Sequence, residues 1–103
     1  MVKVLCACAS GSGSSLLMEM ATKKALKSLG LLDKDIYVQH CPLGEAKGQY
    51  KNYNILLVGK NFVSTFADAI SKGANVIGIV NMMSDKEISE AIKKSLVLEK
   101  LGY

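Results

Sequence analysis

The N-terminal stretch V2-K-V-L-C-A-C-A-S-G-S-G-S-S-L-L-M-E-M20 decides the fold. Its first part, from Val2 to Ala7, is apolar apart from Lys3, which is typical of a strand covered on both faces. A loop of small residues starts at Cys8, and a helix is predicted to begin near Ser14. The stretch therefore predicts a buried strand, a tight loop and a helix, with a thiol at the end of the strand.

The loop between strand and helix contains only Ala, Ser and Gly after its cysteine. The glycines let the backbone turn so that amide N–H groups point inward, and the helix adds unpaired N–H groups and a positive dipole end. Such surroundings stabilise a thiolate, which makes Cys8 the candidate catalytic nucleophile and a phosphate on its sulfur the expected ligand. The candidate phosphate-binding residues, through backbone N–H groups and serine hydroxyls, are Ala9, Ser10, Gly11, Ser12, Gly13, Ser14 and Ser15.

Strands and helices are predicted to alternate along the rest of the chain. Further strands are expected at residues 36–41, 55–58 and 76–80, with Pro42 ending the first of these, which is expected at a sheet edge. Gly30 and Gly73 are predicted to end helices, while residues 43–53 are polar and have room for one helical turn. The expected buried helix positions are Leu17, Met18, Ala21, Ala25 and Leu29; Val63, Phe66, Ala67 and Ile70 after a cap at Asn61; and Ile88, Ala91, Ile92 and Leu96 after a capping box of Ser84 and Glu87.

This alternation predicts one α/β domain over residues 1–103, a Rossmann-like four-stranded parallel sheet with helices on both faces. Right-handed crossovers favour strand order 2-1-3-4. Ligands of such sheets bind beyond the carboxyl ends of the strands, beside the first strand. Cys8 is expected there, together with the segments that follow His40, Gly59 and Val80.

Composition narrows the class of protein. The chain has 103 residues, half of them hydrophobic, and a net charge of +4. Its lysines are spread out and its aromatic residues are few, which argues against nucleic acid and favours an anionic partner. The sequence has no signal peptide and no apolar run of the roughly 18 residues that a membrane span needs. Together with its three cysteines, an odd number that is typical of free thiols, this predicts a cytoplasmic protein.

No cofactor is expected. The glycines at 11 and 13 lack the third glycine of a dinucleotide-binding loop, and the Gly-Lys-Ser/Thr of a nucleotide P-loop is missing. Cys6, Cys8, His40 and Cys41 match no usual zinc spacing, so no metal site is predicted. Cys6 and Cys41 are interpreted as packing residues, His40 as a polar edge residue, and Asp85 as a first-turn acid. The Met82–Met83 pair fits either a partner surface or simple packing.

The pattern Cys-x5-Ser-Ser at a strand-to-helix turn resembles the phosphate loop of low-molecular-weight tyrosine phosphatases, which reads Cys-x5-Arg-Ser. Here Ser14 stands in place of the arginine whose guanidinium stabilises the transferring phosphoryl group.

A loop without that arginine resembles the enzyme IIB components of bacterial phosphotransferase sugar-uptake systems. The stretch C8-A-S-G-S-G-S-S-L-L-M-E-M20 is most similar to the ascorbate-type branch, whose loop follows C-G-x-G-x-G-S-S; the chain departs at Ala9 and by its extra Cys6. The resemblance continues at H40-C-P-L-G-E-A-K47 and N81-M-M-S84.

The resemblance implies a phosphotransferase component. Cys8 would accept a phosphoryl group from a histidine of a IIA partner and pass it to a carbohydrate bound by the membrane-embedded IIC partner. Two alternatives remain at this point: a cysteine phosphatase of the same fold, and a non-catalytic module that only binds an anion.

Overall fold

A computed structural model of the chain describes residues 1–8, 14–81 and 83–102, and describes Cys8, Ser14 and Ser15 by their backbone alone. The strands are β1 (Val2–Cys8), β2 (Ile36–Pro42), β3 (Ile55–Gly59) and β4 (Val76–Ile79). The α-helices are α1 (Ser14–Ser28), α2 (Leu43–Gln49), α3 (Ala67–Ser71), α4 (Asp85–Ser95) and α5 (Val97–Lys100), and the 3-10 segments are η1 (Asp33–Asp35), η2 (Tyr50–Asn52) and η3 (Lys60–Phe66).

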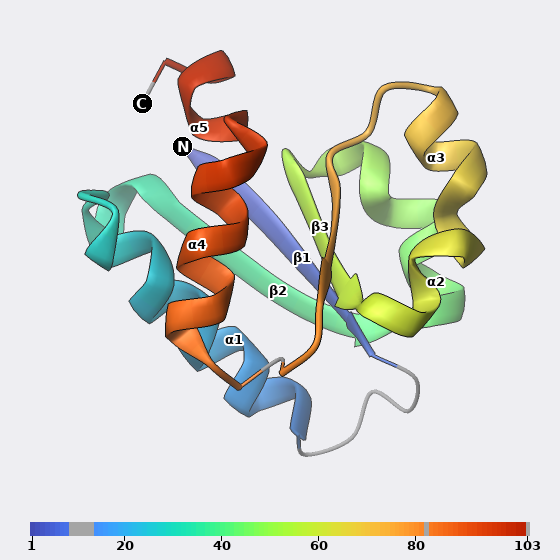
Figure 1. The fold of residues 1–103 in the computed structure, drawn as a ribbon, viewed down its shortest axis with the longest axis horizontal. Helices are drawn as coiled ribbons and strands as arrows, with labels where there is room; N and C mark the ends of the chain where they lie inside the picture. Colours follow the sequence, from blue (N-terminus) through green and yellow to red (C-terminus); the bar gives the residue numbers. More distant parts are fainter. Residues whose placement is uncertain (9–13, 82, 103) are drawn as a thin grey trace.

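The four strands form one parallel sheet in the order β2-β1-β3-β4, which confirms the predicted fold class and strand order (Figure 1). β1 lies inside the sheet, and β2 is an edge strand as predicted. In register, Cys6 of β1 lies opposite His40 of β2, and Cys8 lies opposite Pro42. The last residues of these two strands therefore end side by side at the carboxyl edge of the sheet.

Helices cover both faces of the sheet, as predicted. Figure 1 shows α1, α4 and α5 on one face and α2 and α3 on the other. The first layer buries Met18 and Leu26 of α1 and Ile88 and Ile92 of α4 against side chains of all four strands. The second layer is smaller and buries Ala46, Phe66 and Ala69 against β1 and β3. β1 and β3 are covered on both sides, which explains their nearly continuous apolar sequences.

Local signals end or begin several helices where they were expected. Gly30 and Gly73, with φ of +100° and +92°, follow α1 and α3 in the left-handed region that favours glycine. Ser84 caps α4 by accepting a hydrogen bond from the backbone N–H of Glu87. Of the predicted segment 43–53, residues 43–52 form α2 and η2, so this crossover is more helical than the single turn expected.

The predicted buried stripe of α1 is partly wrong. Leu17 is 50% exposed, whereas Thr22 and Leu26 are fully buried. α1 packs on the sheet and against α4, and its buried residues are Met18, Thr22, Ala25 and Leu26. Adjacent helix residues are about 100° apart around the axis, so the burial of Met18 turns Leu17 toward solvent.

The region after β3 also differs from the prediction. Asn61 caps no α-helix but lies within η3, and Ala67 and Ile70 are exposed while Phe66 and Ala69 are buried. η3 packs closely on β4 at Gly78, where an added Cβ would lie 2.6 Å from Cγ2 of Val63. This close approach of η3 to β4 is a tertiary contact, which the helical pattern could not reveal.

The ends of β4 and α4 are corrected as well. β4 stops at Ile79, and Val80 is 74% exposed. Leu96, predicted to face inward, is 52% exposed and has φ +59°, because it is the left-handed residue between α4 and α5. Val97 is buried in its place. Within the described parts of the chain, no helix combines the length and the apolar character needed to cross a membrane.

Candidate functional site

The backbone places Cys8 at the candidate site predicted from the sequence. Cys8 is the last residue of β1, and β1 lies between β2 and β3, whose crossovers run to opposite faces of the sheet. α1 begins at Ser14, so five residues join the end of the strand to the start of a 15-residue helix. A helix N-terminus presents unpaired N–H groups and a positive dipole end, and can bind a phosphate or other anion.

The predicted phosphate-binding residues are described only in part. Ser14 and Ser15 are the first two residues of α1. Ala9, Ser10, Gly11, Ser12 and Gly13 lie outside the described residues, as does Met82, so their assignment stays a prediction.

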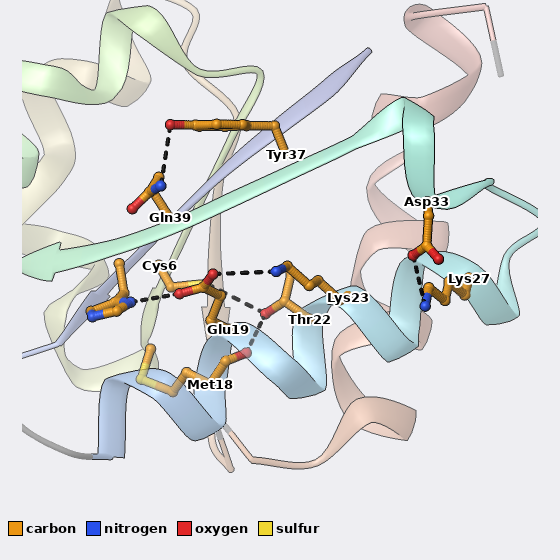
Figure 2. A network of polar contacts seen from close by, with 10 residues as sticks. Cys6, Met18, Glu19, Thr22, Lys23, Lys27, Asp33, Tyr37 and Gln39 are labelled. Atoms are coloured by element: carbon orange, nitrogen blue, oxygen red, sulfur yellow. Dashed lines mark hydrogen bonds and ion pairs between the residues drawn. The ribbon is translucent and has the colours of Figure 1, made fainter.

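His40 forms an ion pair that the sequence did not suggest. Its Nδ1 lies 2.7 Å from Oε2 of Glu19, and Oε1 of the same carboxylate lies 3.4 Å from Nζ of Lys23. Figure 2 shows the carboxylate of Glu19 joined by a dashed line to Lys23, four residues further along the same helix. The side chain of Glu19 is 15% exposed and that of His40 is 34% exposed, so the pair is partly shielded from solvent. The i, i+4 spacing of Glu19 and Lys23 is a sequence signal, but the partnership with His40 is purely tertiary.

Cys6 and Cys41 are buried on opposite faces of the sheet, in agreement with a packing role. Sγ of Cys6 lies 3.4 Å from Oγ1 of Thr22, and that hydroxyl donates a hydrogen bond to the carbonyl oxygen of Met18 (Figure 2). The contact joins β1 to α1 two residues before the end of the strand. Among the described side chains, no three His, Cys, Asp or Glu residues gather as a metal site would require.

The connection from β4 to α4 is held by a carboxylate. Oε2 of Glu87 accepts a hydrogen bond from the backbone N–H of Val80 at 2.6 Å, and Oε1 accepts one from Asn81 at 3.0 Å. In a capping box the glutamate would bond to the N–H of Ser84, but that N–H donates to the carbonyl of Asn81. Asp85 is the first residue of α4, which agrees with its interpretation as a first-turn acid.

A hollow of about 280 Å³ adjoins the carboxyl ends of β3 and β4. Its lining residues are Gly59, Lys60, Asn61, Phe62, Ile79 and Val80. The segments that follow Gly59 and Ile79 therefore do lie at the same edge of the sheet as the end of β1, as the topology predicted.

The chain is similar to proteins of one family along nearly its whole length. Residues 3–94 match the sequence profile described as "PTS system, Lactose/Cellobiose specific IIB subunit". The ascorbate-specific PTS system EIIB component of Mycoplasma pneumoniae is 29% identical over 93 residues, which cover 90% of this chain and 93% of that protein. The protein of the same name from Shigella dysenteriae serotype 1 is 25% identical over 93 residues, covering 90% of this chain and 87% of its own length.

A solved structure supports the fold. The lactose-specific IIB component domain of the phosphoenolpyruvate:carbohydrate phosphotransferase system from Streptococcus pneumoniae aligns with a TM-score of 0.62 and 18% identity, over 99% of this chain and 97% of that one. At this identity the likeness concerns the architecture alone. Because the family profile spans most of its length, the chain belongs to the lactose/cellobiose-specific IIB subunits of the phosphotransferase system (PTS), a component of a sugar-uptake system.

Proposed function

We propose that the chain carries a phosphoryl group on the sulfur of Cys8. In the first step, the thiolate attacks the phosphorus of a phosphohistidine on a IIA protein. The S–P bond forms, the N–P bond breaks, and the released imidazole nitrogen takes up a proton. In the second step, a hydroxyl of a carbohydrate bound by the IIC protein attacks the same phosphorus; the O–P bond forms, Cys8 leaves as a thiolate, and the hydroxyl loses its proton.

One observation carries this proposal. Cys8 ends a strand inside a parallel sheet, and a long helix begins six positions later. Phosphoryl transfer depends on positioning and on stabilising charge, which backbone N–H groups at a helix start can supply without a basic side chain. Ser14 begins the helix where a phosphatase has its arginine, which favours holding the phosphoryl group over releasing it to water.

A protein partner is supported by exposed apolar side chains near the same edge. On α1, Leu16, Leu17 and Met20 are 50–59% exposed, and Met20 lies four residues after Leu16 and three after Leu17, within the first two turns. Val80 and Met83, on the β4–α4 connection, are also exposed. The exposed charged side chains of α1 beyond Met20 are Lys23, Lys24 and Lys27, which suit a partner that brings a negatively charged phosphoryl group. The IIA protein is the partner that we assign to this surface.

The substrate class follows from the relatives. The curated proteins are named for ascorbate and the family for lactose and cellobiose, so we assign a carbohydrate, ascorbate or a related sugar, selected by the membrane partner. The chain would act on the cytoplasmic side of the membrane, as a protein-N-phosphohistidine–sugar phosphotransferase component.

Substitution of Cys8 tests the function. The chain is incubated with a IIA protein phosphorylated on histidine, and phosphate incorporation is measured by intact mass and by acid lability. We expect one phosphoryl group on the parent and on Cys41→Ser, and none on Cys8→Ser. Cys41→Ser is the matched control because Cys41 is buried in the layer away from α1. Incorporation into Cys8→Ser would refute the assignment.

An assay with p-nitrophenyl phosphate separates a carrier from a phosphatase. A carrier turns this ester over slowly, since its loop lacks the arginine that stabilises the transferring group. Rapid turnover that depends on Cys8 would establish the phosphatase instead. A chain that binds inorganic phosphate but accepts none from IIA would be an anion-binding module.

A further inference from the structure

The ion pair between His40 and Glu19 joins two elements that meet at the candidate site. Nδ1 of His40 and Oε2 of Glu19 are 2.7 Å apart. His40 lies two residues before the end of β2, opposite Cys6, and the last residue of β2 lies opposite Cys8. Among the ion pairs found in the described residues, this one links α1 to a strand, while the others lie within α1 or between α1 and the segment that follows it.

Glu19 lies close to the beginning of α1. It is five residues from Ser14, which is about 7.5 Å along a helix axis at 1.5 Å per residue. A shift at Glu19 is therefore passed directly to the first turn of α1, whose N–H groups the proposed transfer uses. A misplacement of about 1 Å between reacting groups can lower a rate by about 100-fold.

Apolar packing leaves this end of α1 less restrained than the other. In the first half of the helix Met18 is buried, but Leu16, Leu17 and Met20 are exposed. The second half is anchored by the fully buried Ala25 and Leu26. The polar contact of Glu19 joins the first half of α1 to β2, and that of Thr22 joins the middle of the helix to β1.

We infer that His40 is a positioning residue for phosphoryl transfer at Cys8: through Glu19, it fixes the first turns of α1 relative to the strand ends. The inference rests on the proposed function and adds to it a residue that does not touch the phosphoryl group. It differs from a role in proton transfer, for which the imidazole itself would be required.

Three variants test the role. His40→Leu and Glu19→Leu each remove the contact, and His40→Lys keeps a nitrogen donor opposite Glu19. With a phosphorylated IIA protein as donor, we expect the maximal phosphorylation rate to fall 10- to 100-fold in both leucine variants and to stay within about threefold of the parent in His40→Lys. The half-saturating donor concentration should change by less than about threefold, since the exposed apolar side chains of the docking surface are untouched. The double leucine variant should be no slower than either single variant, because the two residues act as one unit.

The matched control is the other ion pair of α1. Lys27 and Asp33 are also 2.7 Å apart but lie at the far end of the helix, and both pairs are visible in Figure 2. Asp33→Leu should leave the maximal phosphorylation rate unchanged.

A second measurement needs no donor protein. Inorganic phosphate should slow the alkylation of Cys8 by iodoacetamide, and about tenfold more phosphate should be needed in the two leucine variants than in the parent or in His40→Lys.

The outcomes are distinguishable. An unchanged rate in His40→Leu, or equal losses in His40→Leu and His40→Lys, would overturn the positioning role; equal losses would point to the imidazole itself. Opposite effects of His40→Leu and Glu19→Leu would show that the pair acts through charge and not position, and would also overturn it. If His40→Leu does not fold, Glu19→Leu carries the same expectation. A parent that accepts no phosphoryl group would refute the proposed function, and the phosphate-protection measurement would then decide the positioning role by itself.

Discussion

Oε2 of Glu87 lies 2.6 Å from the backbone nitrogen of Val80, so a side chain in the first turn of α4 holds the residue that follows β4. The second carboxylate oxygen holds Asn81 at 3.0 Å, and the side chain of Asn81 accepts a hydrogen bond from the N–H of Met83. One carboxylate thus satisfies two backbone donors of a connection at the carboxyl edge of the sheet. Because the connection is exposed, water can partly replace a lost bond, so removing one of these bonds should cost about 1 kcal/mol and not the larger penalty of a buried orphaned donor.

Glu87→Gln tests this relationship. Glutamine keeps one carbonyl oxygen, but its NH2 group would face the other backbone N–H, so we expect the free energy of unfolding to fall by about 1 kcal/mol. Urea denaturation measures it. Glu90→Gln makes the same chemical change at an exposed position of the same helix and should cost less than about 0.5 kcal/mol. Equal losses in the two variants would contradict the role of Glu87.

Gly78→Ala tests the close contact of η3 with β4. A Cβ at this position would lie 2.6 Å from Cγ2 of Val63 and 3.2 Å from the backbone Cα of Lys60. Both neighbours would have to move, and we expect a loss of about 1–3 kcal/mol in the free energy of unfolding. Gly48→Ala is the control: it lies in α2, has open space around the added methyl group, and should raise stability by up to about 1 kcal/mol. Stability unchanged in Gly78→Ala would show that η3 can shift without cost.

Leu96→Gly should stabilise the chain. Leu96 has φ +59°, a conformation that costs a residue with a Cβ about 1–2 kcal/mol, and its side chain is 52% exposed, so little burial is lost. We expect a gain of about 0.5–1 kcal/mol, read from the denaturation midpoint. Leu96→Ala keeps the Cβ and should not show the gain. If alanine stabilises as much as glycine, backbone strain at this position is not the cause.

Leu17→Gln tests the proposed docking surface on α1. Leu17 is 50% exposed, so its replacement should hardly alter stability, but it should raise the half-saturating concentration of phosphorylated IIA protein about tenfold or more. The maximal rate should change little. Ile70→Gln is the matched control, because Ile70 is 44% exposed on α3, on the other face of the sheet. An equal effect of the two variants would remove the reason to place the donor on α1.

The pKa of Tyr53 gives a prediction at alkaline pH. Burial raises the pKa of Tyr53 above its usual 10.0, and the nearby Tyr37 and Cys41 raise it further because their anions would repel a tyrosinate. The folded chain therefore holds the phenolic proton more tightly than the unfolded chain. The contribution of Tyr53 to stability is complete below about pH 10 and is lost as the pH rises through the raised pKa.

Tyr53→Phe should accordingly lose less stability than the parent between about pH 9 and pH 11. Urea denaturation at the two pH values measures the difference, and tyrosinate absorbance should show that a tyrosine with a raised pKa is missing from the variant. A parallel decline of the two proteins would mean that Tyr53 titrates alike in the folded and unfolded chains.

The strands, their order and several helix ends could be predicted from the sequence because each depends on neighbours in the chain. The apolar run from Val2 to Ala7 can form a strand only if both of its faces are covered, and alternating strands and helices leave few right-handed arrangements. Gly30 and Ser84 act through their own backbone and side-chain chemistry within one turn of a helix. The place of Cys8 at the end of β1 followed from the same local pattern.

The wrong predictions concern features that depend on tertiary packing and not on neighbours in the chain. Leu17 was expected to be buried because it fits an apolar stripe. The rotation of α1 about its axis depends instead on how the helix packs against the sheet and α4. Asn61 has the side chain of a helix cap, yet η3 packs directly on Gly78 and takes 3-10 geometry instead. Both outcomes depend on the shape of a distant surface, which no spacing of residues encodes.

The sequence by itself determined the architecture and the position of one thiol at its carboxyl edge, because hydrophobic periodicity and glycine placement act over a few residues. Only the tertiary structure decided which side chains restrain that edge. Glu19 contacts His40, which lies 21 positions away in the chain. Glu87 accepts a hydrogen bond from the residue after β4 and not from the start of its own helix. Hydrogen bonds and ion pairs act over a few ångströms in space, and folding alone brings such distant residues within that range.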